Sequence, residues 1–295
     1  MSYNVAFLGL GVMGYPMAGH LAANGHKVTV YNRTQSKAKA WVKQHGGKSA
    51  STPAAAAKGA DMVFACVGND DDVRSVVYGK TGAFAGMVKG TIFVDHTTAS
   101  ADLARELAAD GRKAGIAVLD GPVSGGEAGA QNGALTVMCG GTKAAFKKAQ
   151  PVMDCYGKAV TLMGAAGSGQ LTKMVNQICI AGLVQGLAEG LNFAEKAGLD
   201  GDLVLDVIGK GAAQSWQMDN RGKTMLRDKF EFGFAVNWMR KDLGICLAEA
   251  EGNGALLPVI SVVDQFYKQV QIRGGGRWDT SSLIHLLHHT GAKKK

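Results

Sequence analysis

A glycine-rich segment near the start of the chain limits the possible folds more than any other feature of the sequence. Residues 4–9 read NVAFLG, a short apolar run typical of a buried parallel strand, and residues 9–14 read GLGVMG ahead of a helical pattern. This GxGxxG spacing between a strand and a helix is typical of a dinucleotide-binding βαβ unit. The first glycine permits a tight turn, the second lets the backbone approach a pyrophosphate, and the third lets helix and strand pack closely. The sequence therefore predicts cofactor contacts from Gly9, Leu10, Gly11, Val12, Met13 and Gly14 at the start of a helix, where phosphates are favoured.

The residues after the second predicted strand, 27–31, indicate which dinucleotide is bound. A carboxylate there would bind the adenosine 2′-hydroxyl of NAD, but the sequence reads Asn32-Arg33-Thr34, with Lys37 one helical turn later. A guanidinium suits a 2′-phosphate, so we expect NADP to be preferred, with NAD still possible. The alternative is that Arg33 is a solvated loop residue that stacks on adenine without selecting the cofactor.

The alternation of strands and helices stops near residue 164. Up to that point apolar runs predict further strands at 61–67, 91–95, 116–119, 134–139 and 160–163. Beyond it only helical periodicity remains, at 170–196, 202–209, 215–225, 236–252 and 258–271. We therefore expect an α/β NADP-binding domain over residues 1–164 and an all-α substrate and oligomerisation domain over 165–295, joined by a long interdomain helix.

The start of that long helix carries polar side chains on one side. Lys173, Asn176 and Gln177 are spaced i, i+3 and i+4, so they share a helix face that is otherwise apolar. An ammonium and two amides in this setting favour a functional site. The alternative is that Lys173 extends to solvent, as lysines often do.

Small residues later in the same helix predict close helix packing. Gly182, Gly186 and Gly190 recur every four residues and form a ridge that another helix can approach. The partner helix could belong to the same chain or to another subunit, and we expect a homodimer or homotetramer.

Two loops at predicted strand ends are candidates for ligand binding. Residues 120–126 read DGPVSGG, and Ser124, Gly125 and Gly126 can expose a hydroxyl and backbone N–H groups to a carboxylate, although a simple turn has the same composition. The acidic run 70–72 could suggest a metal, but first-turn carboxylates at a helix N-terminus are the favoured interpretation.

Composition excludes several classes of function. The five cysteines form no CxxC pair, and neither they nor the histidines have zinc-ligand spacing, so we predict no metal site and a reducing, cytoplasmic location. The net charge is +8, but the basic residues are scattered, which disfavours nucleic acid. The first apolar run lacks a charged n-region, and Gln185 and Glu189 interrupt the long helix, so we expect neither a signal peptide nor a membrane span.

Four motifs in order resemble the β-hydroxyacid dehydrogenase family, which includes 3-hydroxyisobutyrate dehydrogenase and the tartronate, succinic semialdehyde and glyoxylate reductases. They are GLGVMGYPMAGHL at the N-terminus, DGPVSGG at 120–126, GxxGxGxxxKxxN at 164–176, and Lys241-Asp242-Leu243. The resemblance implies a Rossmann-type N-terminal domain and an all-helical C-terminal domain. It implies that Lys173 and Asn176 are catalytic, that Ser124, Gly125, Gly126 and Gln177 bind substrate, and that Val67, Thr98 and Lys241 lie near the cofactor. Gln177 stands where some members have asparagine, which leaves its amide contacts open.

The chemistry of these residues agrees with that resemblance. When a hydride reaches an aldehyde carbon, negative charge grows on the carbonyl oxygen, and the ammonium of Lys173 can stabilise that charge and supply a proton. We therefore expect hydride transfer between NADP(H) and a small β-hydroxy acid or semialdehyde. The alternatives are an imine reductase-like enzyme, which the lysine disfavours, and a non-catalytic NADP-binding protein.

Overall fold

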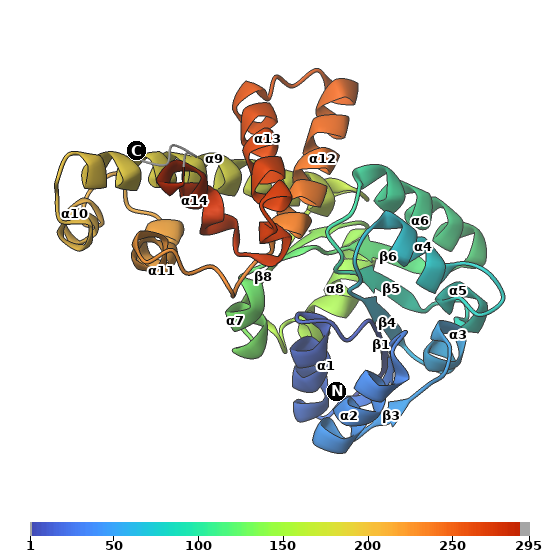
Figure 1. Ribbon diagram of the computed structural model, residues 1–295. Coiled ribbons are helices and arrows are strands. Elements are labelled where there is room, and N and C mark those ends of the chain that lie inside the picture. Colours follow the sequence, from blue (N-terminus) through green and yellow to red (C-terminus); the bar gives the residue numbers. More distant parts are fainter. Residues whose placement is uncertain (1, 290–295) are drawn as a thin grey trace. The chain divides into compact units, whose positions relative to one another are not determined.

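The computed structural model of the protein describes residues 2–289 (Figure 1). The basic C-terminal residues 293–295 lie outside the described range. The chain divides into two compact units, Met1–Lys173 and Met174–Lys295, which are described separately.

One sheet forms the centre of the first unit. Its parallel part has the order β3-β2-β1-β4-β5-β6, made by β1 (Asn4–Leu8), β2 (Lys27–Tyr31), β3 (Lys48–Ser49), β4 (Met62–Ala65), β5 (Ile92–Asp95) and β6 (Ala117–Asp120). The sheet continues through β7 (Val123–Ser124), β8 (Leu135–Gly140) and β9 (Gly157–Gly164), with β8 antiparallel to β6 and β7 but parallel to β9. The strand order reverses at β1, and in such sheets ligands bind at the carboxyl ends of the strands beside that point.

Helices cover both faces of this sheet. They are α1 (Gly14–Ala23), α2 (Gln35–His45), α3 (Pro53–Ala57), α4 (Asp70–Val77), α5 (Ala83–Gly86), α6 (Ala101–Ala114), α7 (Gly126–Gln131) and α8 (Lys143–Met153). Alternate residues of β1 enter different cores, because successive side chains of a strand point to opposite faces. Phe7 packs in a cluster with Met17 and Trp41, whereas Leu8 packs in a second cluster with Leu103.

The second unit is helical. It contains most of α9 (Ser168–Lys196), followed by α10 (Gly201–Ile208), α11 (Trp216–Leu226), α12 (Val236–Asn253), α13 (Pro258–Ile272), η1 (Gly275–Arg277), η2 (Thr280–Ser282) and α14 (Leu283–His288). In Figure 1, α12 and α13 run side by side, and both contribute to one apolar core. Within the described residues, α9 is the one helix long and apolar enough to cross a membrane, but core helices of soluble proteins pass the same test.

The predicted fold class is confirmed: a Rossmann-type α/β domain and an all-α domain are joined by the long helix α9. Strand β2 occupies the predicted residues 27–31. Ser100 caps α6 by accepting a hydrogen bond from the Leu103 N–H. The elements that the sequence missed include β3, α5, β7, α7 and α14. Each is only two to six residues long, too short for a hydrophobic period to emerge.

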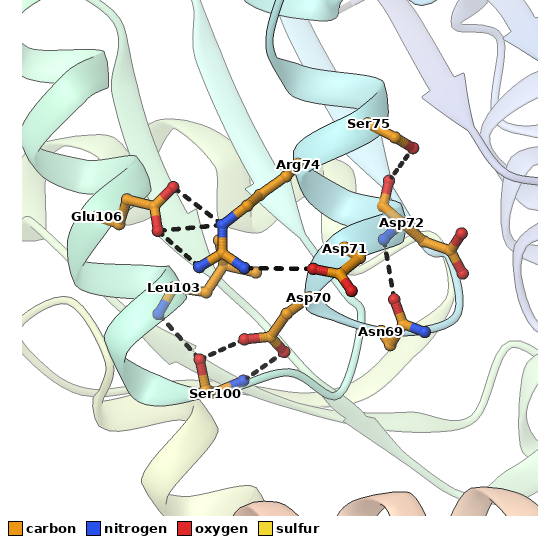
Figure 2. A network of polar contacts seen from close by, with 9 residues as sticks. All are labelled: Asn69, Asp70, Asp71, Asp72, Arg74, Ser75, Ser100, Leu103 and Glu106. Atoms are coloured by element: carbon orange, nitrogen blue, oxygen red, sulfur yellow. Dashed lines mark hydrogen bonds and ion pairs between the residues drawn. The ribbon is translucent and has the colours of Figure 1, made fainter.

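The acidic run at the start of α4 is part of a network between helices (Figure 2). Asn69 caps α4 by accepting from the Asp72 N–H at 2.9 Å, so residues 70–72 form the first turn of the helix. Asp70 accepts from the backbone N–H of Ser100 at 3.0 Å, and Arg74 pairs with Glu106 at 2.7 Å. These bonds connect α4 to α6, and the carboxylates complement the helix dipole.

Candidate active site

The glycines in the turn after β1 differ in how much space surrounds them. Gly9 has φ +97°, and a Cβ on Gly14 would lie 2.1 Å from the Gly9 carbonyl oxygen, so the fold itself excludes larger residues at these two positions. Gly11 is exposed, and no heavy atom lies within 4 Å of the position its Cβ would take. Packing therefore does not require glycine at position 11, whereas close approach of a ligand to the backbone would.

Asn32 supports this turn from the end of β2. Its Oδ1 accepts a hydrogen bond from the Leu10 N–H at 2.9 Å, and its Nδ2 donates to the Thr34 carbonyl at 3.1 Å. The side chain of Arg33 is 89% exposed and lies 3.6 Å from an Asp72 carboxylate oxygen, and Lys37 is also exposed. The structure thus brings two cations to one edge of the sheet, beside one carboxylate that the sequence reasoning had not paired with them.

The loop after β5 is held by hydrogen bonds from neighbouring elements. The Thr97 hydroxyl oxygen accepts from the Val67 N–H at 3.0 Å, which fixes the end of β4 against the end of β5. Gln170 of α9 donates to the Thr97 carbonyl at 2.7 Å and accepts from the Ala99 N–H at 3.0 Å. These contacts determine the backbone course on both sides of Thr98.

His96 at the same strand end has a structural role. Its ring is buried between the Gly121 carbonyl and the Tyr156 hydroxyl, the latter 2.8 Å from Nε2. Burial lowers the pKa of His96 to about 4, which keeps the imidazole neutral at physiological pH.

Asp120, at the end of β6, anchors the start of α9, a role that sequence reasoning missed. Its two carboxylate oxygens accept from the N–H groups of Gly167 at 2.8 Å and Gln170 at 2.9 Å. Lys173 follows Gln170 by three residues on α9, and its side chain is buried. The position of Lys173 is therefore set by a cap whose residues are 50 positions apart in sequence.

Two further polar residues of α9, Asn176 and Gln177, belong to the helical unit. The Asn176 amide donates to Gln177 Oε1 at 2.8 Å, and Gln177 Nε2 donates to an Asp242 oxygen at 2.6 Å. Lys241 Nζ lies 3.0 Å from the other Asp242 oxygen. Gln177 and Lys241 thus both contact Asp242, and Asn176 is connected to it through Gln177. The sequence motif included Asp242 but did not predict this role for it.

The remaining candidates lie on a short connection. Ser124 ends β7, and Gly125 and Gly126, both exposed with φ of +132° and +61°, lead into α7. The segment predicted as a turn or a carboxylate-binding loop is thus a strand end followed by a short helix.

Comparison with known proteins agrees with this architecture. Residues 4–164 match the family described as the NAD binding domain of 6-phosphogluconate dehydrogenase. Residues 167–287 match the family described as NAD-binding of NADP-dependent 3-hydroxyisobutyrate dehydrogenase.

Similar proteins extend over nearly the whole chain. A Shewanella frigidimarina protein described as an uncharacterized oxidoreductase is 65% identical over 96% of this chain and 97% of its own length. The 2-hydroxy-3-oxopropionate reductase of Escherichia coli is 33% identical, covering 96% of both chains. The solved Mycobacterium tuberculosis 3-hydroxyisobutyrate dehydrogenase with L-serine is 31% identical, with a TM-score of 0.89 over 97% of this chain and 99% of that one. The chain therefore belongs to the β-hydroxyacid dehydrogenase family of NAD(P)-binding oxidoreductases that act on CH–OH groups.

Proposed function

We propose that this enzyme transfers a hydride between NADP(H) and a small β-hydroxy acid or semialdehyde, with Lys173 as general acid and base. The observation that carries the proposal is the buried Lys173 on the first turns of α9, held by Asp120 and Gln170 to the ends of β5 and β6. Those strand ends belong to the sheet edge where a dinucleotide binds in folds of this kind.

Each protein group has a defined task in this reaction. The bound cofactor supplies the hydride that reaches the carbonyl carbon. The Lys173 ammonium stabilises the charge that grows on the oxygen and donates the proton, and in the oxidation direction the neutral amine removes the hydroxyl proton. Ser124 and the backbone of Gly125 and Gly126 bind the substrate carboxylate.

Asn176 orients the substrate in this scheme, and Gln177 acts through Asn176. Both ends of the Gln177 amide are engaged in hydrogen bonds, with Asn176 and with Asp242, and the side chain is buried. We therefore revise the sequence-based hypothesis for Gln177 from substrate contact to positioning residue. Lys241, which pairs with Asp242, stays a proposed cofactor contact.

The preference for NADP over NAD rests on the charge at the end of β2. Arg33 and Lys37 are exposed there, and a 2′-phosphate would compete with Asp72 for the Arg33 guanidinium. The neighbouring backbone of Asn32 and Thr34 completes the proposed adenosine site, as Gly9 to Gly14, Val67 and Thr98 complete the rest.

The test is turnover of small aldehyde acids with NADPH and, in parallel, NADH. The panel is glyoxylate and the succinic, methylmalonate and tartronate semialdehydes. We expect turnover of at least one, with higher kcat/KM for NADPH than for NADH. Equal efficiency with both cofactors would contradict the NADP preference, and silence across the panel with NADPH still bound would favour a non-catalytic binding protein.

Substitution of the lysine tests the mechanism. Lys173→Met is expected to lower kcat by about 10²–10⁴-fold, the usual contribution of a general acid, while NADPH binding measured by fluorescence persists. Lys196→Met removes an exposed lysine from the other end of the same helix and serves as the matched control. Equal activity of Lys173→Met and wild type would refute the assigned role.

Location and assembly complete the proposal. All five cysteines are free thiols, which suits a reducing compartment, and we expect a cytoplasmic enzyme, a placement that cell fractionation tests. Gly186 and Gly190 are exposed on α9, with no heavy atom within 4 Å of their Cβ positions, which supports a role of this ridge in contacts between subunits.

A further inference from the structure

A cluster of imidazoles and carboxylates occupies one end of the helical unit and has no part in the proposed reaction. Asp228 follows α11, His285 lies in α14, and His289 is the C-cap residue of α14. His285 Nδ1 is 3.0 Å from both oxygens of Asp228, and His289 Nε2 is 3.3 Å from one of them. The fold thus brings together three side chains that are the usual ligands of transition metals.

The spacing of these atoms suits a single ion. One ligand atom from each of Asp228, His285 and His289 can be chosen so that all lie within 4.8 Å of one another. Around a tetrahedral ion with bonds of about 2.0–2.1 Å, neighbouring ligand atoms lie roughly 3.4 Å apart. The separations in the cluster are therefore close to those a metal requires, and small side-chain rotations suffice to bind one.

The local backbone presents the two histidines together. They are four residues apart, and the His289 N–H donates to the His285 carbonyl at 3.2 Å, which continues the helical pattern and keeps both rings on one side. Their ring centroids are 4.3 Å apart. Two imidazoles this close repel each other when both are protonated, whereas a metal binds both in the neutral form.

A second pair of ligand-type side chains flanks the three. His288 Nδ1 lies 3.8 Å from Asp228, and its Nε2 lies 2.7 Å from a Glu195 oxygen, although without the alignment of a hydrogen bond. The side chains of Asp228 and His289 are 38% and 56% exposed, so an ion can enter from solvent and keep water in a remaining position.

We propose that Asp228, His285 and His289 bind a divalent transition-metal ion of the Zn²⁺ type, which fastens α14 to the segment after α11. The mixed nitrogen and oxygen donors, with an open position, favour Zn²⁺ or Co²⁺ over the all-oxygen sites of Mg²⁺ and Ca²⁺. The sequence-based expectation of no metal site did not consider the i,i+4 spacing of His285 and His289, and it could not foresee a carboxylate 57 residues before His285.

The test uses the full chain without a histidine tag, stripped with a chelator and titrated with Zn²⁺ by calorimetry. We expect one Zn²⁺ per chain, a rise in Tm of at least about 3 °C at saturating Zn²⁺, and visible absorption bands when Co²⁺ is used instead. The double variant His285→Gln/His289→Gln, and separately Asp228→Asn, should bind at least about tenfold more weakly. His26→Gln, which removes a half-buried imidazole from the first unit, should bind as wild type does.

Two results would overturn the proposal. One is the absence of stoichiometric Zn²⁺ binding and of the Co²⁺ bands in the folded wild type, which would leave an ordinary hydrogen-bonded cluster. The other is equal affinity in the wild type and the double variant, with circular dichroism confirming that both are folded. Since the site is separate from Lys173, Zn²⁺ affinity is measured without any turnover assay, and the two proposals can fail independently.

Discussion

At the scale of single residues, the glycines of the turn after β1 are needed for different reasons, some for the fold and one for the proposed ligand. Gly9 and Gly14 are constrained by the protein's own backbone, whereas the space beside Gly11 is empty. The same residue type thus serves two purposes within six positions. A pair of identical substitutions can distinguish them.

We expect Gly14→Ala to affect the stability of the fold and Gly11→Ala to affect cofactor binding. Gly14→Ala should destabilise the fold by about 1–3 kcal/mol, because its methyl group would meet the Gly9 carbonyl oxygen. Gly11→Ala should leave Tm nearly unchanged but weaken NADPH binding at least about tenfold, because a methyl group would enter the pyrophosphate site. Thermal unfolding and fluorescence titration of both variants measure these effects, and normal NADPH affinity in Gly11→Ala would disprove the cofactor assignment.

At the scale of elements, the carboxyl end of β5 carries two buried groups with opposite effects on stability. Burial raises the pKa of Asp95 to about 7, so this carboxyl stabilises the fold at low pH and loses that contribution as pH rises towards 7. Burial lowers the pKa of His96 to about 4, so the neutral imidazole stabilises the fold above about 6.5 and loses that contribution as pH falls towards 4. Between about pH 4 and 6.5 the slopes that Asp95 and His96 give to the free energy of unfolding as a function of pH cancel.

In the Asp95→Asn variant, the contribution of His96 to the pH dependence of stability should no longer be cancelled. An asparagine oxygen can still accept from the Thr97 N–H, which is 2.9 Å from Asp95 Oδ1, so the loop is expected to persist. The free energy of unfolding of this variant should fall by about 1 kcal/mol per pH unit from pH 6.5 to 4, a steeper loss than in wild type. Urea unfolding at four pH values measures this slope. If the free energy of unfolding changes with pH equally in the wild type and in Asp95→Asn, the raised pKa of Asp95 is rejected.

At the scale of the whole molecule, exposed apolar side chains on the helical unit support the proposed association with a second copy of the chain. Leu203 and Val207, four residues apart on α10, are each 61% exposed, and Phe193 near the end of α9 is 72% exposed. Gly186 and Gly190 leave space for close helix approach in the same unit. Exposed apolar side chains that lie close together on a protein surface are typical of an association face.

We expect light scattering to give at least twice the 30.7 kDa mass of one chain. Leu203→Asp/Val207→Asp should shift the protein towards a monomer, because it would bury two charges in the contact. Val88→Asp, at an exposed valine of the first unit, is the matched control and should leave the mass unchanged. A monomeric wild type would reject the association.

The sequence by itself determined what depends on local pattern. The GxGxxG spacing after an apolar run predicted the strand, the turn and the dinucleotide-binding fold, because turn geometry and phosphate binding involve neighbouring residues. Helical periodicity predicted the long helix α9 and the change to an all-α unit. Together with the ordered motifs, these features also identified the family, and they left Lys173 as a predicted catalytic residue.

Only the tertiary structure decided which distant residues meet. Asn32 holds Leu10, Asp120 caps α9, and Gln177 bonds to Asp242, across separations of 22 to 65 residues. Asp228 meets His285 across 57 residues and forms the proposed metal site. Such pairs leave no periodic trace, because a hydrogen bond depends on where the folded chain brings its two atoms and not on their spacing along the sequence. The hydrogen bonds that support the proposed site therefore became visible only in the structure, whereas the glycines and the lysine proposed for it were predicted from the sequence.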